Sequence, residues 1–191
     1  MLINKRLYCH SPSKTGNTII RDKHFAKPIK GTNFSFNFWI YLENAPENVC
    51  RSASYDTPID IFTMKQTDDE FTLQINQHTS NLILKLNKNT EQTFNIIDAL
   101  PNQKWINISI NVENKYVDVF VDGKLYNAFY SPNIIKFLPL TNMTIKCAFG
   151  FYGYISKLRY FNSFIDYKRV NRLYKNNRRE SGDHDLLWWI K

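Results

Sequence analysis

The sequence contains little glycine and proline, with six and seven of these residues among 191. Collagen-like and linker-rich chains need far more of both, and a phosphate-binding loop needs clustered glycines, so these classes are excluded. No apolar run reaches the roughly 20 residues that a membrane-spanning helix needs. Residues 1–6 lack the apolar core of a secretory signal peptide. We therefore expect a soluble chain that does not direct its own secretion.

Cysteine is also scarce. Cys9, Cys50 and Cys147 lie far apart, and none belongs to a Cys/His cluster with zinc-ligand spacing. One disulfide remains an alternative, but we favour three free buried thiols, which points to a reducing compartment.

Catalytic patterns are missing too. The densest acidic run, 68–70, precedes a strand-like segment and is typical of a turn, and the four histidines are scattered. Retaining glycosidases need two carboxyl groups about 5–5.5 Å apart, which requires i, i+2 spacing within a strand. Asp118 and Asp122 do not have that spacing. We expect no enzyme, no catalytic residue, no cofactor and no metal ion.

Aromatic residues, in contrast, are abundant: 14 Phe, 11 Tyr and 4 Trp exclude a disordered chain. From Phe34 to Leu42 the side chains alternate with a period of two, which is typical of a strand with one face in the core. The dipeptide Asp122-Gly123 is a strong hairpin signal. The further predicted strands are 59–64, 71–75, 82–86, 105–112, 116–121, 124–130, 143–149 and 154–161.

One helix is predicted, with Asp166 as its cap and Val170, Leu173 and Tyr174 on one face. Many antiparallel strands with almost no helix indicate a β-sandwich or jelly roll. We expect an all-β antiparallel sandwich with one short C-terminal helix. Its expected parts are an N-terminal arm (1–32) that supplies one or two edge strands, the sandwich (33–165), a basic helix (166–179) and an apolar tail (180–191).

Four segments resemble, in order, the laminin-G-like members of the concanavalin A-like lectin/glucanase superfamily. They are an early strand ending near a tryptophan (34–40), a strand opened by a tryptophan (105–110), a hairpin with an Asp-Gly turn (119–125) and a closing Phe-x-Gly-x-Ile strand (151–162). The resemblance covers about residues 30–176 and implies two curved antiparallel sheets. Trp39 and Trp105 are expected to pack between or beside these sheets.

The resemblance also bears on chemistry. The glucanases of this superfamily carry Glu-x-Asp-x-Glu on one strand, and this sequence lacks it. Many relatives bind calcium at a rim, where Asp122 could take part, but we assign Asp122 to the turn.

Positive charge is concentrated near the C-terminus. The formal net charge is +8, and residues 157–179 hold eight basic side chains but one acidic one. Such a patch favours an anionic partner, although a solvated helix face is an equal alternative. The residues assigned to this surface are Lys168, Arg169, Arg172 and Lys175.

The segment 186–190 is strongly apolar and follows an acidic, polar spacer. Such residues either fold back on the domain or insert into a partner. We assign an apolar anchor to Leu187, Trp188 and Trp189.

We therefore expect a non-catalytic structural or interaction protein. The Asn-, Ile- and Lys-rich composition is typical of AT-rich genomes, and the closing strand looks similar to domains encoded by large double-stranded DNA viruses. This suggests a minor capsid or particle component that contacts capsid proteins through its arm, basic helix and tail, in the virion or at a cytoplasmic assembly site. Nucleic acid is not favoured as a partner, because no groove-reading motif accompanies the basic helix. A membrane surface is a further alternative partner.

The alternative is an extracellular glycan-binding lectin domain. Its glycan rim would include Tyr152 and Tyr154, with Tyr41 and Tyr55 as further candidates.

Overall fold

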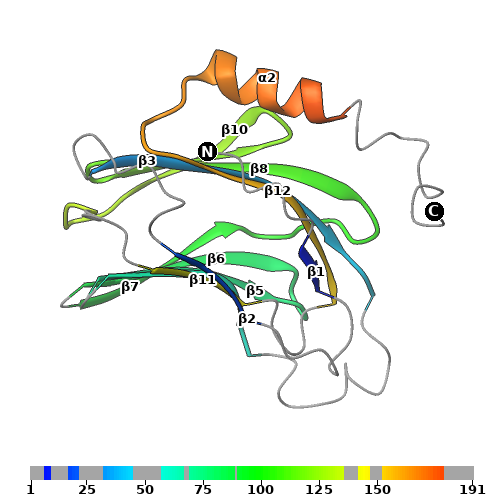
Figure 1. Ribbon diagram of the computed structural model, residues 1–191, viewed down its shortest axis with the longest axis horizontal. Coiled ribbons are helices and arrows are strands. Elements are labelled where there is room, and N and C mark those ends of the chain that lie inside the picture. The colour runs from blue at the N-terminus through cyan, green and yellow to red at the C-terminus, as the bar shows by residue number, and fades with distance from the viewer. Residues whose placement is uncertain are drawn as a thin grey trace.

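The computed structural model describes residues 7–9, 17–21, 32–44, 57–66, 69–88, 90–135, 142–146 and 152–178. Two six-stranded antiparallel sheets face each other, and one helix lies over the outer side of one of them (Figure 1). The predicted all-β sandwich with a short C-terminal helix is confirmed.

The first sheet lies directly beneath the helix. Its strand order is β1-β12-β3-β8-β9-β10. The strands are β1 (Leu7–Cys9), β3 (Asn33–Leu42), β8 (Trp105–Glu113), β9 (Tyr116–Val121), β10 (Lys124–Tyr130) and β12 (Gly153–Phe161).

The second sheet has the strand order β2-β11-β4-β5-β6-β7. Its strands are β2 (Asn17–Arg21), β4 (Ile59–Gln66), β5 (Asp69–Asn76), β6 (Asn81–Lys88), β7 (Thr90–Ile97) and β11 (Asn142–Lys146). The short strands β1 and β2 come from the N-terminal arm, and each forms one edge of a sheet, as the sequence predicted.

Strand β7 was missed by the sequence analysis. Its first four residues, 90–93, are polar and lack the β-branched alternation that marks the other strands. Tertiary pairing decides its structure, since β7 pairs antiparallel with β6, with Phe94 opposite Leu84.

The core between the sheets is rich in phenylalanine. Phe36 on β3 is completely buried and has four aromatic neighbours with ring centroids 5.1–5.9 Å away. These neighbours are Phe34, Phe62, Phe71 and Tyr160. All four pairs are tilted or edge-to-face, which is the favourable arrangement for aromatic pairs.

The other face of β3 and β8 is buried as well. It carries Asn and Ser residues that alternate with the core residues. The alternation therefore separates an apolar buried face from a polar buried face, and neither face is exposed to solvent. Ser35, Asn37, Asn107, Ser109 and Asn111 are each at most 1% exposed. The helix α2 (Tyr167–Arg178) and the loop before it cover this face, as Figure 1 shows.

We predict that Phe36→Ala lowers the free energy of unfolding by about 3–5 kcal/mol, because it removes the centre of the aromatic cluster and leaves a cavity. Urea unfolding followed by circular dichroism measures the change. The control Tyr126→Ala, at a side chain that is 48% exposed, changes the value by at most about 0.5 kcal/mol. Equal effects of the two substitutions would contradict this account of the core.

Candidate functional site

Buried side-chain amides join the strands beneath the helix. The amide nitrogen of Asn37 donates to the Asn107 side-chain oxygen (3.0 Å) and to the Ser109 hydroxyl (2.8 Å). The amide nitrogen of Asn107 in turn donates to the Phe38 carbonyl (3.2 Å). A polar group that leaves water without a partner is costly, so these bonds offset part of the cost of burying this face.

Two further bonds fix the loop that leads into α2. The Asn111 side-chain nitrogen donates to the Ile165 carbonyl (2.7 Å), and the Ser35 hydroxyl donates to the Ser163 carbonyl (2.9 Å). Strands β8 and β3 therefore determine where the helix starts.

Apolar contacts hold the helix along its length. Val170 is fully buried in a small cluster with Phe120 and Ile165. One turn later Tyr174 stacks on Trp39, with centroids 6.0 Å apart and planes 24° apart. The predicted packing face of the helix is confirmed, as is the packing role of Trp39, which is 3% exposed.

Gly123 allows this close approach. A Cβ atom there would lie 3.1 Å from the Tyr174 ring, and the backbone has a positive φ of 79°, which L side chains rarely adopt. Asp122 precedes it in the hairpin turn, also with positive φ, and its carboxylate accepts the Asn107 backbone N–H (2.9 Å). The turn role predicted for Asp122 is confirmed.

The start of the helix is capped as predicted. The Asp166 carboxylate accepts the backbone N–H of Arg169 (2.7 Å), and its carbonyl accepts that of Val170 (2.9 Å). The first bond satisfies a donor that has no partner within the helix, and the second is the first i→i−4 bond of the helix.

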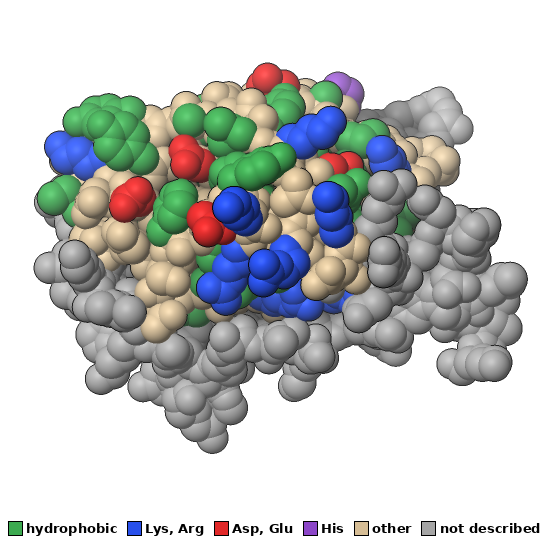
Figure 2. All heavy atoms as spheres, turned by 90° about the horizontal axis from the view of Figure 1, so that it is seen from above, with side chains coloured by type: hydrophobic (Ala, Val, Ile, Leu, Met, Phe, Trp, Pro, Cys, Tyr) green, Lys and Arg blue, Asp and Glu red, His purple; other side chains and the backbone are tan. Residues whose placement is uncertain are grey.

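The remaining surface of α2 is cationic. Lys168, Arg169, Arg172 and Lys175 are all exposed, and we call them the basic face. Arg169 lies over the Phe161 ring, 4.8 Å from its centroid. Within the described part of the chain, none of the four pairs with a carboxylate. Figure 2 looks down on this side and shows Lys and Arg side chains gathered there.

Beyond the end of α2, three aromatic rings gather on the outer side of the first sheet. Tyr41, Trp105 and Tyr154 come from the neighbouring strands β3, β8 and β12, and we call them the aromatic shelf. Their centroids are 5.4 Å (Tyr41–Trp105), 5.9 Å (Tyr41–Tyr154) and 6.4 Å (Trp105–Tyr154) apart. All three side chains are half-buried.

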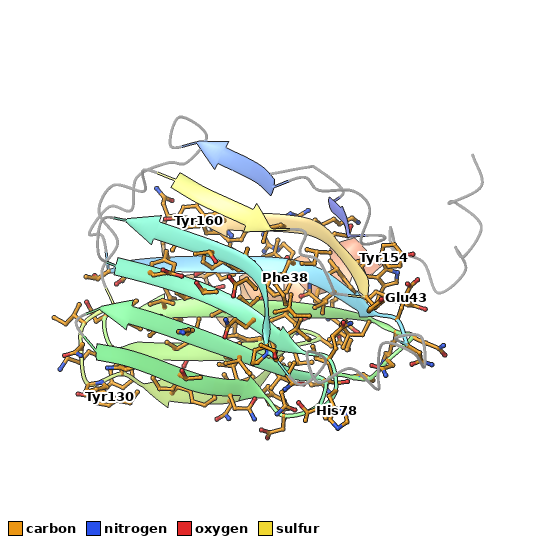
Figure 3. The ribbon with its side chains drawn as sticks, turned by 90° about the horizontal axis from the view of Figure 1, so that it is seen from below. Phe38, Glu43, His78, Tyr130, Tyr154 and Tyr160 are labelled. Atoms are coloured by element: carbon orange, nitrogen blue, oxygen red, sulfur yellow. The ribbon has the colours of Figure 1, made fainter. Side chains whose placement is uncertain are left out.

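Glu43 adds a carboxylate to the shelf and accepts a hydrogen bond from the Tyr154 hydroxyl; the two lie side by side in Figure 3. Burial, followed by this bond and the charges of Glu43 and Tyr41, raises the pKa of Tyr154 from 10.0 to about 12. The phenol is therefore a neutral donor at physiological pH.

The sequence-predicted site residues fall into three groups. The basic face lies on one helix, as expected. Of the expected glycan rim, Tyr41 and Tyr154 lie in the shelf. Tyr152 contributes its backbone carbonyl, which accepts from the Glu43 N–H (3.0 Å) and the Gln77 side chain (3.1 Å). Leu187, Trp188, Trp189 and Tyr55 lie outside the described residues.

The sequence analysis did not group Trp105 and Glu43 with the shelf. The sequence analysis assigned Trp105 to packing. The strand register could have placed it in the shelf, because Trp105 on β8 is paired with Tyr41 on β3, and Tyr41 is paired with Tyr154 on β12. That register becomes visible only when the three strands are aligned.

Two absences hold for the described ranges alone. No group of three His, Cys, Asp or Glu residues there is arranged to hold a metal ion. Likewise, no helix in the part of the chain that is described has the length and apolar character needed to cross a membrane.

Comparison with known proteins identifies the family of this chain. A model of the concanavalin A-like lectin/glucanases superfamily, in its laminin G form, matches residues 14–170. The chain belongs to this superfamily. No curated protein matches the chain.

Several solved structures share the fold of this superfamily member. The botulinum neurotoxin serotype G binding domain is 19% identical, with a TM-score of 0.63 over 81% of this chain. The serotype D binding domain is 15% identical, with a TM-score of 0.63 over 86%. The chain spans only 39% and 41% of their lengths. At these identities the likeness establishes the fold alone.

We predict that Asp166→Ala lowers the free energy of unfolding by about 0.5–2 kcal/mol, because the first turn of α2 loses its cap. Chemical unfolding measures the loss. Asp166→Asn keeps a capping oxygen and is the matched control; we expect it to keep most of the stability. If the Asn variant loses as much as the Ala variant, the capping role is wrong.

We also predict that Tyr154 stays protonated well above pH 10. Because its folded pKa is raised, its contribution to stability is complete below pH 10 and is lost as the pH rises toward about 12. NMR titration of the tyrosine ring carbons, assigned with Tyr154→Phe, measures this pKa. In Glu43→Gln it should fall, but stay above 10 because burial is the larger cause. A midpoint at or below 10 in the unaltered chain would refute the contact with Glu43.

Proposed function

We propose that this chain is a non-catalytic interaction module whose basic face binds an acidic surface of a partner protein. The observation that carries the proposal is the set of four exposed cations on a capped, docked helix, without a carboxylate partner among the described residues. Cations that are fixed on a rigid element lose little entropy on binding, which favours an electrostatic contact.

The geometry of α2 supports an extended acidic partner. Lys168, Arg172 and Lys175 follow one another at i, i+4 and i+7, so they form one stripe along the helix. Lys and Arg side chains attract carboxylates through long-range electrostatic forces. Salt screens this attraction, and at 0.1 M the Debye length is about 10 Å.

Family membership agrees with a binding role. Three solved structures with this fold are binding or receptor-binding domains of botulinum neurotoxins. As for its setting, the Asn-, Ile- and Lys-rich sequence and the closing-strand resemblance support a minor component of a large DNA virus particle that contacts capsid proteins. Cross-linking mass spectrometry on native material tests this setting, which fails if Lys168 and Lys175 link to no particle protein.

The basic face is tested with a glutamate decapeptide as the probe. We predict that Lys168→Glu combined with Arg172→Glu weakens its binding by roughly tenfold at low salt, since each lost ion pair is worth up to about 1 kcal/mol. Fluorescence anisotropy of the labelled peptide measures the affinity. The control, Lys85→Glu with Lys115→Glu, changes the net charge equally. Lys85 lies on β6 of the second sheet and Lys115 in the turn between β8 and β9, so this variant should keep the affinity within about twofold.

Equal losses in both double variants would mean that only the net charge attracts the peptide, and would refute the proposal. So would tighter binding to a DNA duplex of equal charge than to the peptide, because the partner would then be a nucleic acid.

A further inference from the structure

The aromatic shelf lies where the chain leaves α2. The helix begins beside Phe161, where Arg169 lies over the ring, and Phe161 is paired with Ser35. It reaches Trp39 at Tyr174. The helix therefore runs in the direction of β3, and the next outward-facing residue on that strand after Trp39 is Tyr41 of the shelf.

The end of the helix is level with the shelf. From Tyr174 to Arg178 a helix advances about 6 Å, and from Trp39 to Tyr41 a strand advances about 7 Å. Figures 1 and 3 agree, because α2 ends on the side of the molecule where Tyr154 and Glu43 lie.

We propose that the apolar segment 186–190 packs on the aromatic shelf of its own chain. From residue 178 to residue 186 there are eight residue steps, which reach about 26–29 Å when extended. The shelf lies well within this distance. The proposal does not depend on the acidic partner of the basic face.

The chemistry of the two surfaces is complementary. The shelf offers three tilted, half-buried rings, and the segment offers two leucines, an isoleucine and two tryptophans. A buried indole N–H needs an acceptor, and the Glu43 carboxylate keeps lone pairs beyond the one that Tyr154 uses. The exposed Lys104 beside Trp105 suits the acidic spacer, which carries Glu180, Asp183 and Asp185.

A second exposed aromatic pair serves as a comparison surface. Tyr116 and Tyr130, 59% and 55% exposed with centroids 5.5 Å apart, lie at the opposite end of the first sheet. Tyr116 is paired with Glu113, which is paired with Asn33, eight residues from Tyr41 along β3. The distance from Tyr41 to Tyr116 is therefore about 28 Å, made of about 26 Å along the strand and two strands across the sheet. Only a fully extended spacer could carry the apolar segment from the end of α2 to this pair.

The test uses NMR of the full chain with labelled Leu and Ile methyl groups. We expect nuclear Overhauser contacts from the methyl groups of Leu187 and Ile190 to ring protons of Tyr41, Trp105 or Tyr154. An isotope-filtered experiment on a mixture of labelled and unlabelled chains should show no such contact between copies. In Trp188→Ala combined with Trp189→Ala, the ring signals of Trp105 and Tyr154 should shift, while those of Tyr116 and Tyr130 stay in place.

A control variant, Tyr116→Ala combined with Tyr130→Ala, should leave the tail contacts unchanged. The contacts expected in the unaltered chain test the proposal independently of how the tail variant folds.

Three outcomes would overturn the proposal. The first is contacts from the tail to Tyr116 or Tyr130 instead of the shelf. The second is contacts that appear only between copies, or not at all. The third concerns glycans: if lactose shifts the Trp105 signals equally with and without the tail tryptophans, the shelf is an open sugar site and the tail does not occupy it.

Discussion

The stack of Tyr174 on Trp39 is the contact on which the outer half of this structure depends. An isolated helix of 12 residues is marginal in water, so α2 owes its structure to what it packs against. The outer side of β3 and β8 depends equally on the helix, because it buries amides and hydroxyls of Asn and Ser residues together with a tryptophan. Helix and sheet face therefore stabilise each other, and Gly123 gives the tyrosine the space it needs.

This docking also arranges the two surfaces that we interpret as functional. With Val170 and Tyr174 turned to the sheet, Lys168, Arg172 and Lys175 must face solvent, so the apolar contacts determine the direction of the cationic stripe. The helix ends at Arg178, about level with Tyr41, and the three rings of the aromatic shelf stay half-exposed. An acidic partner on the helix and an apolar segment on the shelf would use neighbouring but distinct parts of the first sheet.

Much of the fold could be predicted from the sequence because its signals are local. The alternation from Phe34, the Asp122-Gly123 turn and the Asp166 cap each act within a few residues, and the structure confirms all of them. Strand β7 was missed because pairing with β6, rather than its own composition, makes it a strand. The shelf was only partly found, since three strands distant in the sequence bring Tyr41, Trp105 and Tyr154 together.

Hydrogen exchange tests the docking of α2 most directly. We predict that the amides of Leu173 and Tyr174 are protected almost as well as those in the middle of β8, because the helix opens only when the underlying sheet face is exposed to water. Mass spectrometry or NMR in deuterated buffer at neutral pH measures the rates. Exchange of these helical amides at the rate of an unstructured peptide, while β8 stays protected, would show that the helix is not docked and would contradict the account.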